Sequence, residues 1–356
     1  MPEKISRLRQ LFGPAGIDAF YITNPENRYY LSGFTGSTGA LLVTREQSYM
    51  LTDFRYTAQA AMESPGYQVI EVSGTYAAVL FRLLKENCLF RLGLEGDHQT
   101  CNQYFNLSKV RAGVEIKPLS DQVEQLRMLK DESEIGLIEK AVSIADLSFA
   151  QILPLIKPGV TEQEIALQLE YTMRRMGADG PAFKIIVASG VRSALPHGVA
   201  SAKTIAVGDL VTFDFGAVYQ GYHSDITRTV VINSSNLRQK EIYKIVLEAQ
   251  MNAIAAVKAG VCASDVDWAA RSIIEKKGYG ECFGHSTGHG LGLGIHENPS
   301  LAAKNDTILE PGMVVTIEPG IYIRNWGGVR IEDTVVVEDN GCRILTKTPK
   351  EKLLVL

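Results

Sequence analysis

Four acidic residues stand inside apolar segments, where an isolated carboxylate is rarely found because its burial costs free energy. They are Asp214, Asp225, Glu318 and Glu332. Burial and mutual repulsion would raise the pKa of each carboxyl group unless a cation lay between them. We therefore predict that the four side chains converge on bound cations.

The acids of each pair belong to the two strands of a predicted hairpin. Asp214 and Asp225 lie on apolar runs separated by a turn at 219–221. Their position numbers sum to an odd number, so a two- or four-residue loop brings both carboxylates to one face of the sheet at nearly the same level. For Glu318 and Glu332 the sum is even, so a shared face requires a loop with an odd number of residues.

Between the two hairpins lies a segment rich in histidine and glycine, residues 284–297. It holds three of the six histidines and five glycines, which permit a close approach of the backbone to a site. Four carboxylates and an imidazole suit two divalent cations, which bridging carboxylates can hold about 3.5–4 Å apart. A mostly oxygen ligand set without cysteine favours Mn²⁺, with Co²⁺, Zn²⁺ or Fe²⁺ as alternatives.

An internal repeat organises the part of the chain that carries these residues. Residues 157–177 match residues 258–278 at a constant offset of 101 positions. In each copy a helix is expected to end at Lys-x-Gly, and a second helix to begin after an N-cap, Thr161 or Ser264, and to end at glycine. The repeat predicts two similar halves related by a pseudo-twofold axis, where a shared site could lie.

The preceding part of the chain alternates short apolar runs with helical patterns, which predicts an α/β domain. The expected strands are 18–22, 40–43, 49–51, 69–72 and 91–94, and the expected helices are 3–12, 55–63, 75–86 and 99–109. A charged run at 130–134 then opens a long helix whose apolar residues recur at steps of three and four. We place the domain boundary between residues 127 and 128.

Length and composition fit a folded two-domain protein and exclude several classes. The chain has 356 residues, of which 46% are apolar and 21% charged, and its net charge of −4 provides no basic field for nucleic acid. Five cysteines without a C-x-x-C pair suit a reducing compartment. With no leader and no run of about 20 apolar residues, we expect a cytoplasmic protein without nucleic-acid or membrane partners.

The motifs around the acids resemble those of the pita-bread metallopeptidases, family M24. They are F-D-F-G at Asp214, H-S-D-I-T-R-T at Asp225, G-H-G-L-G at His289, I-E-P-G at Glu318 and V-R-I-E-D-T at Glu332. The segments 195–198, 320–322 and 327–330 resemble the proline-specific branch, Xaa-Pro aminopeptidase and Xaa-Pro dipeptidase (prolidase), and the segments 27–34 and 52–56 are similar to its N-terminal domain. The resemblance implies a creatinase-like α/β domain at 1–127 and a pita-bread catalytic domain with pseudo-twofold symmetry at 128–356.

The resemblance also implies a role for each candidate residue. Asp214 would bind one metal ion, Asp225 and Glu332 would bridge both, and His289 and Glu318 would complete the second. A hydroxide between the ions would be the nucleophile, and Glu318 would shuttle its proton. The histidines expected to orient the substrate and stabilise the oxyanion are His197, His285 and His296. The residues expected to line the substrate pocket are Phe183, Ile295, His296, Tyr322 and Arg330.

The implied substrate is a peptide with proline at its second position, but aminopeptidase and dipeptidase stay open. Some prolidases carry an arginine shortly after the His-Glu pair, whereas Ser300 follows His296-Glu297-Asn298-Pro299 here. Methionine aminopeptidase shares the ligands but usually lacks so large an N-terminal domain. Creatinase has the two-domain plan without the dinuclear ligand set, and a non-catalytic binding protein would have lost ligands. The family further implies a homodimer, with Phe34 or Arg55 as exposed contact residues.

Overall fold

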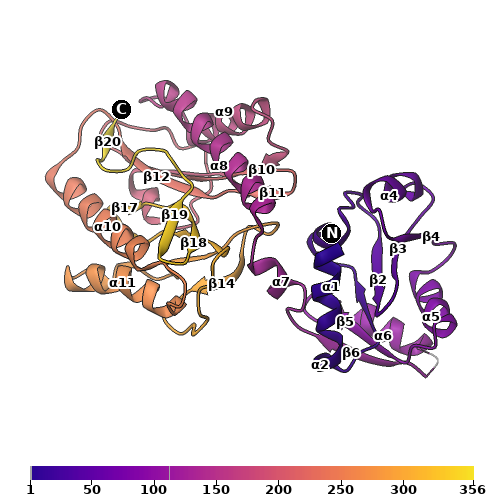
Figure 1. Ribbon diagram of the computed structural model, residues 1–356. Coiled ribbons are helices and arrows are strands. Elements are labelled where there is room, and N and C mark those ends of the chain that lie inside the picture. The colour runs from indigo at the N-terminus through magenta and orange to yellow at the C-terminus, as the bar shows by residue number, and fades with distance from the viewer. Residues whose placement is uncertain (1, 112) are drawn as a thin grey trace. The chain divides into compact units, whose positions relative to one another are not determined.

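The computed structural model describes residues 2–111 and 113–356 and divides into two compact units, Met1–Arg127 and Met128–Leu356 (Figure 1). Both units combine sheets with helices, which confirms the expected α/β class. Among the described residues, no helix combines the length and the apolar character needed to cross a membrane. All five cysteines are free thiols, and Cys88 and Cys101 are exposed.

The first unit is built on a six-stranded sheet with the order β4-β3-β2-β1-β5-β6. Its strands are β1 (Ala19–Ile22), β2 (Ala40–Thr44), β3 (Ser48–Thr52), β4 (Gln68–Glu71), β5 (Arg91–Glu95) and β6 (Glu115–Leu119). Its helices are α1 (Pro2–Gln10), α2 (Phe12–Ala15), α3 (Pro25–Ser32), α4 (Thr57–Glu63), α5 (Tyr76–Glu86) and α6 (Cys101–Val110), and α7 (Glu124–Met128) follows. The five expected strands and four expected helices are confirmed, whereas β6, α3 and the short helices α2 and α7 were missed.

Two residues that we expected to be exposed contacts lie in different environments in the first unit. Arg55 is exposed and pairs with Asp53, with 2.7 Å between Nη2 and Oδ2. Phe34 is only 1% exposed, so its predicted exposure was wrong. Its ring packs edge-on against Tyr56, with 6.0 Å between centroids, and lies under the guanidinium of Arg28. Phe34 therefore supports the packing of its own unit.

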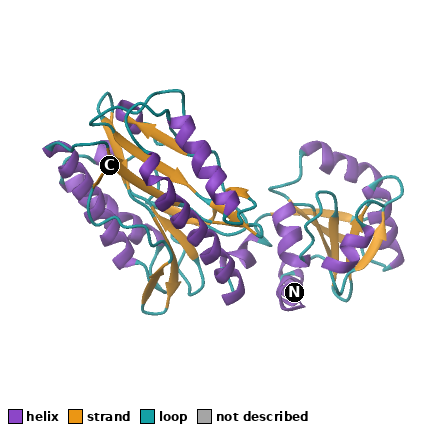
Figure 2. Ribbon diagram, turned by 90° about the horizontal axis from the view of Figure 1, so that it is seen from above, coloured by secondary structure: helices purple, strands orange, loops and turns teal. Residues whose placement is uncertain are grey.

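The second unit begins with the long helix α8 (Glu132–Ile152), whose Asp131 forms a capping box with Glu134. The apolar residues predicted to share one face of this helix are all buried: Ile135, Ile138, Val142, Ala145 and Phe149. The other helices are α9 (Glu162–Arg175), α10 (Leu237–Ala256) and α11 (Ala263–Lys276). In Figures 1 and 2 the strands of this unit lie between two groups of helices, α8 with α9 and α10 with α11.

Two larger sheets form the centre of the second unit. A four-stranded sheet has the order β20-β12-β9-β8, and a five-stranded sheet has the order β14-β13-β15-β18-β19. Their strands are β8 (Ile186–Ser189), β9 (Leu210–Phe215), β12 (Ile226–Val231), β20 (Leu354–Val355), β13 (Gly288–Gly290), β14 (Glu297–Leu301), β15 (Val314–Ile317), β18 (Asp333–Glu338) and β19 (Gly341–Ile344). The smaller sheets contain β7 (Gly180–Pro181), β10 (Ala217–Tyr219), β11 (Tyr222–His223), β16 (Gly320–Ile323) and β17 (Gly327–Arg330).

The internal repeat is confirmed by the backbone of its two helix pairs. Gly159 and Gly260 have φ of +94° and +82°, and the glycines that end the second helices have φ of +98° and +85°. Thr161 caps α9 through a capping box, as predicted. The predicted cap of α11, Ser264, was wrong, because the helix begins two residues earlier, after Cys262, which makes no side-chain cap bond. Cys262 is the repeat counterpart of Thr161, so the backbone follows the repeat rather than the better capping residue.

Both predicted hairpins are present, and their registers explain where the acids meet. Asp214 on β9 lies opposite Thr227 on β12, and the two-residue loop after Tyr219 gives the odd sum that puts Asp214 and Asp225 on one face. The predicted level was slightly wrong, since Asp225 lies two residue pairs beyond the pair of Asp214 and Thr227. In the second hairpin the three residues between Ile323 and Gly327 form the odd loop that the even sum of Glu318 and Glu332 requires.

Candidate metal centre

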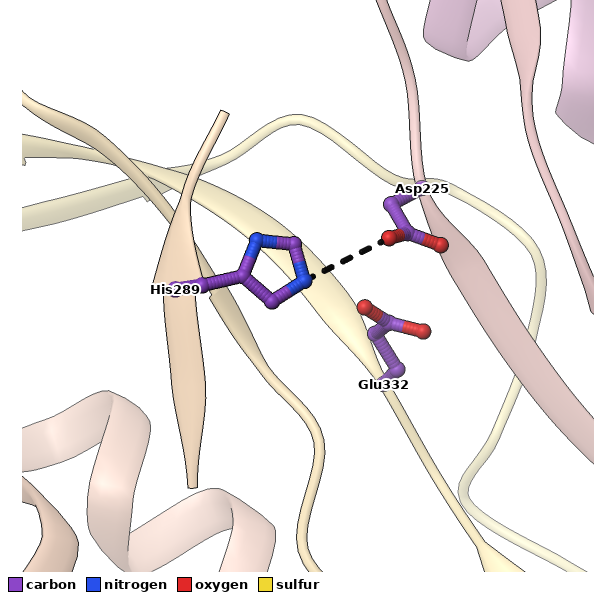
Figure 3. A group of neighbouring side chains, drawn as sticks. All are labelled: Asp225, His289 and Glu332. Carbon is purple, nitrogen blue, oxygen red and sulfur yellow. Dashed lines mark ion pairs between the residues drawn. The ribbon is translucent and has the colours of Figure 1, made fainter. Parts of the chain in front are cut away.

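The predicted ligands converge at the place where the two hairpins face each other. Ligand atoms of Asp225, His289 and Glu332 all lie within 4.8 Å of one another. Figure 3 shows the imidazole of His289, carried by β13, pointing toward the two carboxylates. His289 Nε2 is 3.6 Å from Asp225 Oδ2 and 3.4 Å from Glu318 Oε1. Four of the five residues thus form one cluster of possible ligand atoms.

Asp214 adjoins this cluster through Arg330. Its Oδ2 accepts a hydrogen bond of 2.5 Å from Arg330 Nη2, and its negative charge helps to raise the pKa of Asp225, Glu318 and Glu332. All five residues identified from their motifs therefore lie close enough to interact electrostatically.

Burial and mutual repulsion raise the pKa values of three carboxyl groups in the cluster. Burial, followed by the charges of Glu332, Asp214 and Glu318, raises the pKa of Asp225 well above its ordinary value. Burial and the charges of Glu318 and Asp214 do the same to the pKa of Glu332. Burial raises the pKa of Glu318 to about 8, although Arg330 opposes the shift. These groups bind protons firmly unless another positive charge replaces the protons.

Two buried oxygen atoms in this cluster have no hydrogen-bond partner within residues 2–111 and 113–356. They are Asp225 Oδ1 and Glu332 Oε1. The two residues are 5% and 1% exposed, so water does not replace the missing partners freely. Buried polar atoms are normally paired, and an unpaired one costs about 1–3 kcal/mol. The unpaired oxygens belong to the two residues expected to bridge metal ions, so the donor set fits a divalent metal centre.

His289 is held in the tautomer that a metal ligand requires. Its Nδ1 lies 2.9 Å from the carbonyl oxygen of Gly290 and can only donate there, so Nε2 carries the lone pair that faces the carboxylates. Burial lowers the pKa of His289 to about 4, which keeps the ring neutral. A Cβ atom on Gly288 would meet the carbonyl oxygen of Thr316 at 1.8 Å, and one on Gly290 would meet that of Asn298 at 2.3 Å. Both glycines are needed to bring this strand so close.

The other predicted histidines surround the cluster. His285 Nε2 lies 2.9 Å from the hydroxyl of Tyr322, which accepts a hydrogen bond of 2.8 Å from Arg330 Nη1. Burial lowers the pKa of His285 to about 4, and the charges of Arg330 and His197 lower it further. The ring of His296 lies edge-on to that of His289, with 4.4 Å between centroids.

The predicted pocket residues divide into two groups. Phe183 and Ile295 are half-buried, and His296 is exposed beside the predicted metal ligand His289. Arg330 is 3% exposed, and its guanidinium donates to Thr227 Oγ1, the carbonyl oxygen of Pro196, Tyr322 and Asp214. The structure gives Arg330 internal partners, and its binding of a substrate carboxylate stays a prediction.

Sequence reasoning missed two hydroxyl groups that orient ligands. Thr227 Oγ1 donates to Glu332 Oε2 at 2.8 Å, and Thr316 Oγ1 donates to Glu318 Oε1 at 3.3 Å. The signal was available, because Thr227 stands two residues after Asp225, and Thr316 two residues before Glu318. In a strand, residues two apart share a face.

Comparison with known proteins supports a metallopeptidase. The model of metallopeptidase family M24 matches residues 136–339, and that of the creatinase/prolidase N-terminal domain matches residues 4–129. A solved structure of the Xaa-Pro dipeptidase from Bacillus anthracis is 48% identical, with a TM-score of 0.98 and 99% of each chain covered. The X-Pro aminopeptidase from Thermotoga maritima is 44% identical, with a TM-score of 0.90 over 96% of this chain and 98% of that one. The Xaa-Pro dipeptidase of Pyrococcus furiosus is 43% identical over 99% of this chain and its own full length.

Proposed function

The chain belongs to metallopeptidase family M24, and from this we propose that it hydrolyses the bond between a first residue and proline in Xaa-Pro dipeptides. The observation that carries the proposal is the pair of unpaired buried oxygens on Asp225 and Glu332, which a bound cation would satisfy. The dipeptide is favoured over longer peptides because relatives at 48% and 43% identity are named Xaa-Pro dipeptidases. We assign catalysis to residues 128–356.

The residues that would hold two divalent ions are Asp214, Asp225, His289, Glu318 and Glu332. When bound, the ions would lower the pKa of a water molecule and polarise the scissile carbonyl group. We assign Mn²⁺ as the preferred metal, since oxygen ligands dominate the set, with Co²⁺, Zn²⁺ and Fe²⁺ as alternatives. Glu318, whose Oε1 lies 3.4 Å from His289 Nε2, would accept the proton of the attacking water and pass it to the leaving amine.

The histidines and aromatic residues around the ligands would orient the substrate. His285 Nδ1 can only donate to the carbonyl oxygen of Ser286, so its Nε2 accepts from the hydroxyl of Tyr322. His285, with Tyr322, would therefore orient the substrate, while His197 and His296 would donate to the developing oxyanion. A proline ring has no amide hydrogen, so its pocket must act by shape and apolar contact. We assign that pocket to Phe183, Ile295, His296 and Tyr322.

A second candidate activity is the removal of a first residue from longer Xaa-Pro peptides. It is favoured by the likeness to the Thermotoga maritima protein, which is named X-Pro aminopeptidase. We further propose a cytoplasmic homodimer. Sedimentation velocity at micromolar concentration tests the dimer, and a monomer under those conditions contradicts it.

One substrate series tests these proposals together. The protein is loaded with Mn²⁺ and given Xaa-Pro, Xaa-Pro-Yaa, Met-Ala-Yaa and creatine, and release of the first residue is measured. Cleavage of Xaa-Pro alone supports the dipeptidase, and cleavage of the longer proline peptide supports the aminopeptidase. Preference for Met-Ala-Yaa would overturn proline specificity.

A matched pair of variants tests the metal centre. Asp225→Asn removes a bridging ligand and should abolish hydrolysis, whereas Asp265→Asn removes an exposed acid of α11 and should leave it unchanged. Full activity after exhaustive chelation would refute the metallopeptidase mechanism itself.

A further inference from the structure

Helix α11 carries a buried ion pair that the proposed reaction does not use. Arg271 Nε lies 2.8 Å from Asp267 Oδ2, and Arg271 Nη2 lies 2.8 Å from Asp267 Oδ1, so the two side chains meet fork to fork. The Asp267 side chain is 1% exposed and that of Arg271 is 19% exposed. The pair Glu170 and Arg174 on α9 has the same four-residue spacing but is exposed, at 37% and 50%. A buried charge pair of this kind is retained at a cost in desolvation, so its other contacts are informative.

These other contacts all go to one short segment, residues 283–287. Arg271 Nη1 donates to the carbonyl oxygen of Phe283 at 3.0 Å, and Nη2 donates to that of His285 at 2.8 Å. Asp267 Oδ1 accepts from the backbone nitrogen and the hydroxyl of Thr287, at 3.1 and 2.8 Å. The segment belongs to no helix or strand, and its other backbone hydrogen bonds lie at its two ends, where Phe283 donates to Gly280 and Thr287 bonds to Leu301 and Glu318. The pair therefore supplies the contacts that hold the carbonyl groups of Phe283 and His285.

The segment carries groups on which the proposed mechanism depends. The ring of His285 is set between Ser286, whose carbonyl oxygen lies 2.7 Å from Nδ1, and Tyr322. Phe283 lies edge-on to the same ring, with 5.1 Å between centroids, and under the guanidinium of Arg271 at 4.3 Å. The carbonyl oxygen of Thr287 accepts the backbone N–H of the ligand Glu318 at 2.7 Å. A shift of this segment would therefore move both His285 and the backbone of a ligand.

The first repeat copy contains a comparable arrangement. Glu162, fully buried on α9, accepts hydrogen bonds from the backbone and hydroxyl of both Ser189 and Ser201 and pairs with Arg192. These contacts tie together the two ends of the segment that bears His197. In each copy, a buried carboxylate on the second helix holds a segment that carries one of the histidines.

We propose that Asp267 and Arg271 are positioning residues, which place the imidazole of His285 against the substrate by fixing residues 283–287. This inference rests on the proposed function for the kinetic part of its test. The pair has no proposed contact with substrate or metal. Its effect on kcat distinguishes it from an ion pair that only stabilises the fold.

The kinetic test compares Arg271→Met with the control Arg174→Met in the Mn²⁺-loaded full chain. A displacement of about 1 Å at a reacting group can cost roughly 100-fold in rate, so we expect Arg271→Met to lower kcat by roughly 10- to 100-fold. KM for Xaa-Pro and the Kd for Mn²⁺ should change by less than about threefold, because Asp267 still holds Thr287, whose carbonyl oxygen binds the backbone of Glu318. Arg174→Met should leave all three quantities unchanged. An Arg271→Met protein that melts earlier but keeps the wild-type kcat would overturn the proposal.

A double-mutant cycle decides whether Arg271 acts through His285. If it does, adding Arg271→Met to His285→Ala should lower kcat by less than about a further twofold, because the side chain that is positioned is already absent. Equal effects of Arg271→Met in both backgrounds would show that the ion pair acts on stability or on another group, and would refute the assignment.

A spectroscopic measurement keeps the inference independent of the substrate. In protein loaded with diamagnetic Zn²⁺ and labelled with ¹⁵N at histidine, the ring resonances of His285 should move in Arg271→Met and stay in place in Arg174→Met. If the wild type cleaves no proline peptide, the proposed function fails while this measurement still decides the positioning role. Unchanged His285 resonances in Arg271→Met would overturn it.

Discussion

The neighbouring acids Glu332 and Asp333 should respond in opposite ways to the loss of their charge. Glu332 has one unpaired oxygen, and burial with neighbouring negative charges raises its pKa. Asp333 is equally buried, and burial alone would raise its pKa, but Arg228 and Lys350 lower it overall. Its Oδ1 accepts from Arg228 Nη2 at 2.9 Å and its Oδ2 pairs with Lys350. One acid is therefore unsatisfied without metal, and the other is satisfied without it.

We expect Glu332→Gln to stabilise the metal-free protein near pH 8. The substitution removes an unpaired oxygen and a carboxyl group that must either carry a repelling charge or take up a proton, while Thr227 can still donate to the amide oxygen. The free energy of unfolding should therefore rise by about 1–3 kcal/mol. For a unit of this size that is a rise in Tm of roughly 3–9 °C. Asp333→Asn leaves Arg228 and Lys350 buried without full compensation and should cost about 3–5 kcal/mol.

Excess Mn²⁺ should reverse the order of wild type and Glu332→Gln. A metal at 1,000 times its Kd adds about 4.1 kcal/mol to the stability of the protein that binds it, and the variant that lacks one of the proposed ligands should gain little of this. Differential scanning calorimetry with chelator and then with Mn²⁺ measures both differences. A Glu332→Gln protein that melts below the wild type in chelator would refute the account of the unpaired oxygen.

Three further results follow from the same structure. Burial raises the pKa of Glu318 to about 8 in the metal-free protein, so a metal ion must displace protons and Mn²⁺ affinity should rise with pH up to about 8. Calorimetry in two buffers should show proton release, and a pH-independent affinity would contradict this prediction. Phe149→Ala should lower the free energy of unfolding by about 3–5 kcal/mol, because the ring is buried in an aromatic cluster, whereas Phe54→Ala at an exposed position should change little in the same denaturation assay. Burial raises the pKa of Cys342 to about 11, so mass spectrometry after alkylation at neutral pH should find it modified far more slowly than the exposed Cys88, and equal rates would argue against its burial.

The elements that place the ligands were predictable because they follow periodic rules. Strand parity put Asp214 and Asp225 on one face, and the same rule required the odd loop between Glu318 and Glu332 that the structure contains. The position of the α11 cap was not predictable from residue preference, since the backbone begins the helix after Cys262 although Ser264 is the better capping residue.

Other features depended on tertiary contacts that the sequence pattern does not contain. Strand β6 was missed because Pro118 and charged residues interrupt its apolar pattern at the edge of the sheet. Helix α3 was missed although Asn24 and Pro25 provide a standard helix start. Phe34 was expected at the surface because it lies in a loop-like segment, and only the packing of Tyr56 and Arg28 against its ring buries it.

The close approach of β13 to its neighbours limits how this site can change during evolution. Gly288 and Gly290 touch no ion, yet any other residue would place a Cβ atom within 1.8 and 2.3 Å of a neighbouring carbonyl oxygen. A Cβ atom on Gly284, by contrast, would have no heavy atom within 4 Å. In a saturation library selected for peptide hydrolysis, positions 288 and 290 should therefore be as intolerant as the ligands, while alanine at position 284 should pass. The close backbone contacts of β13 should then restrict sequence change in this family as strictly as the need for metal-binding side chains does.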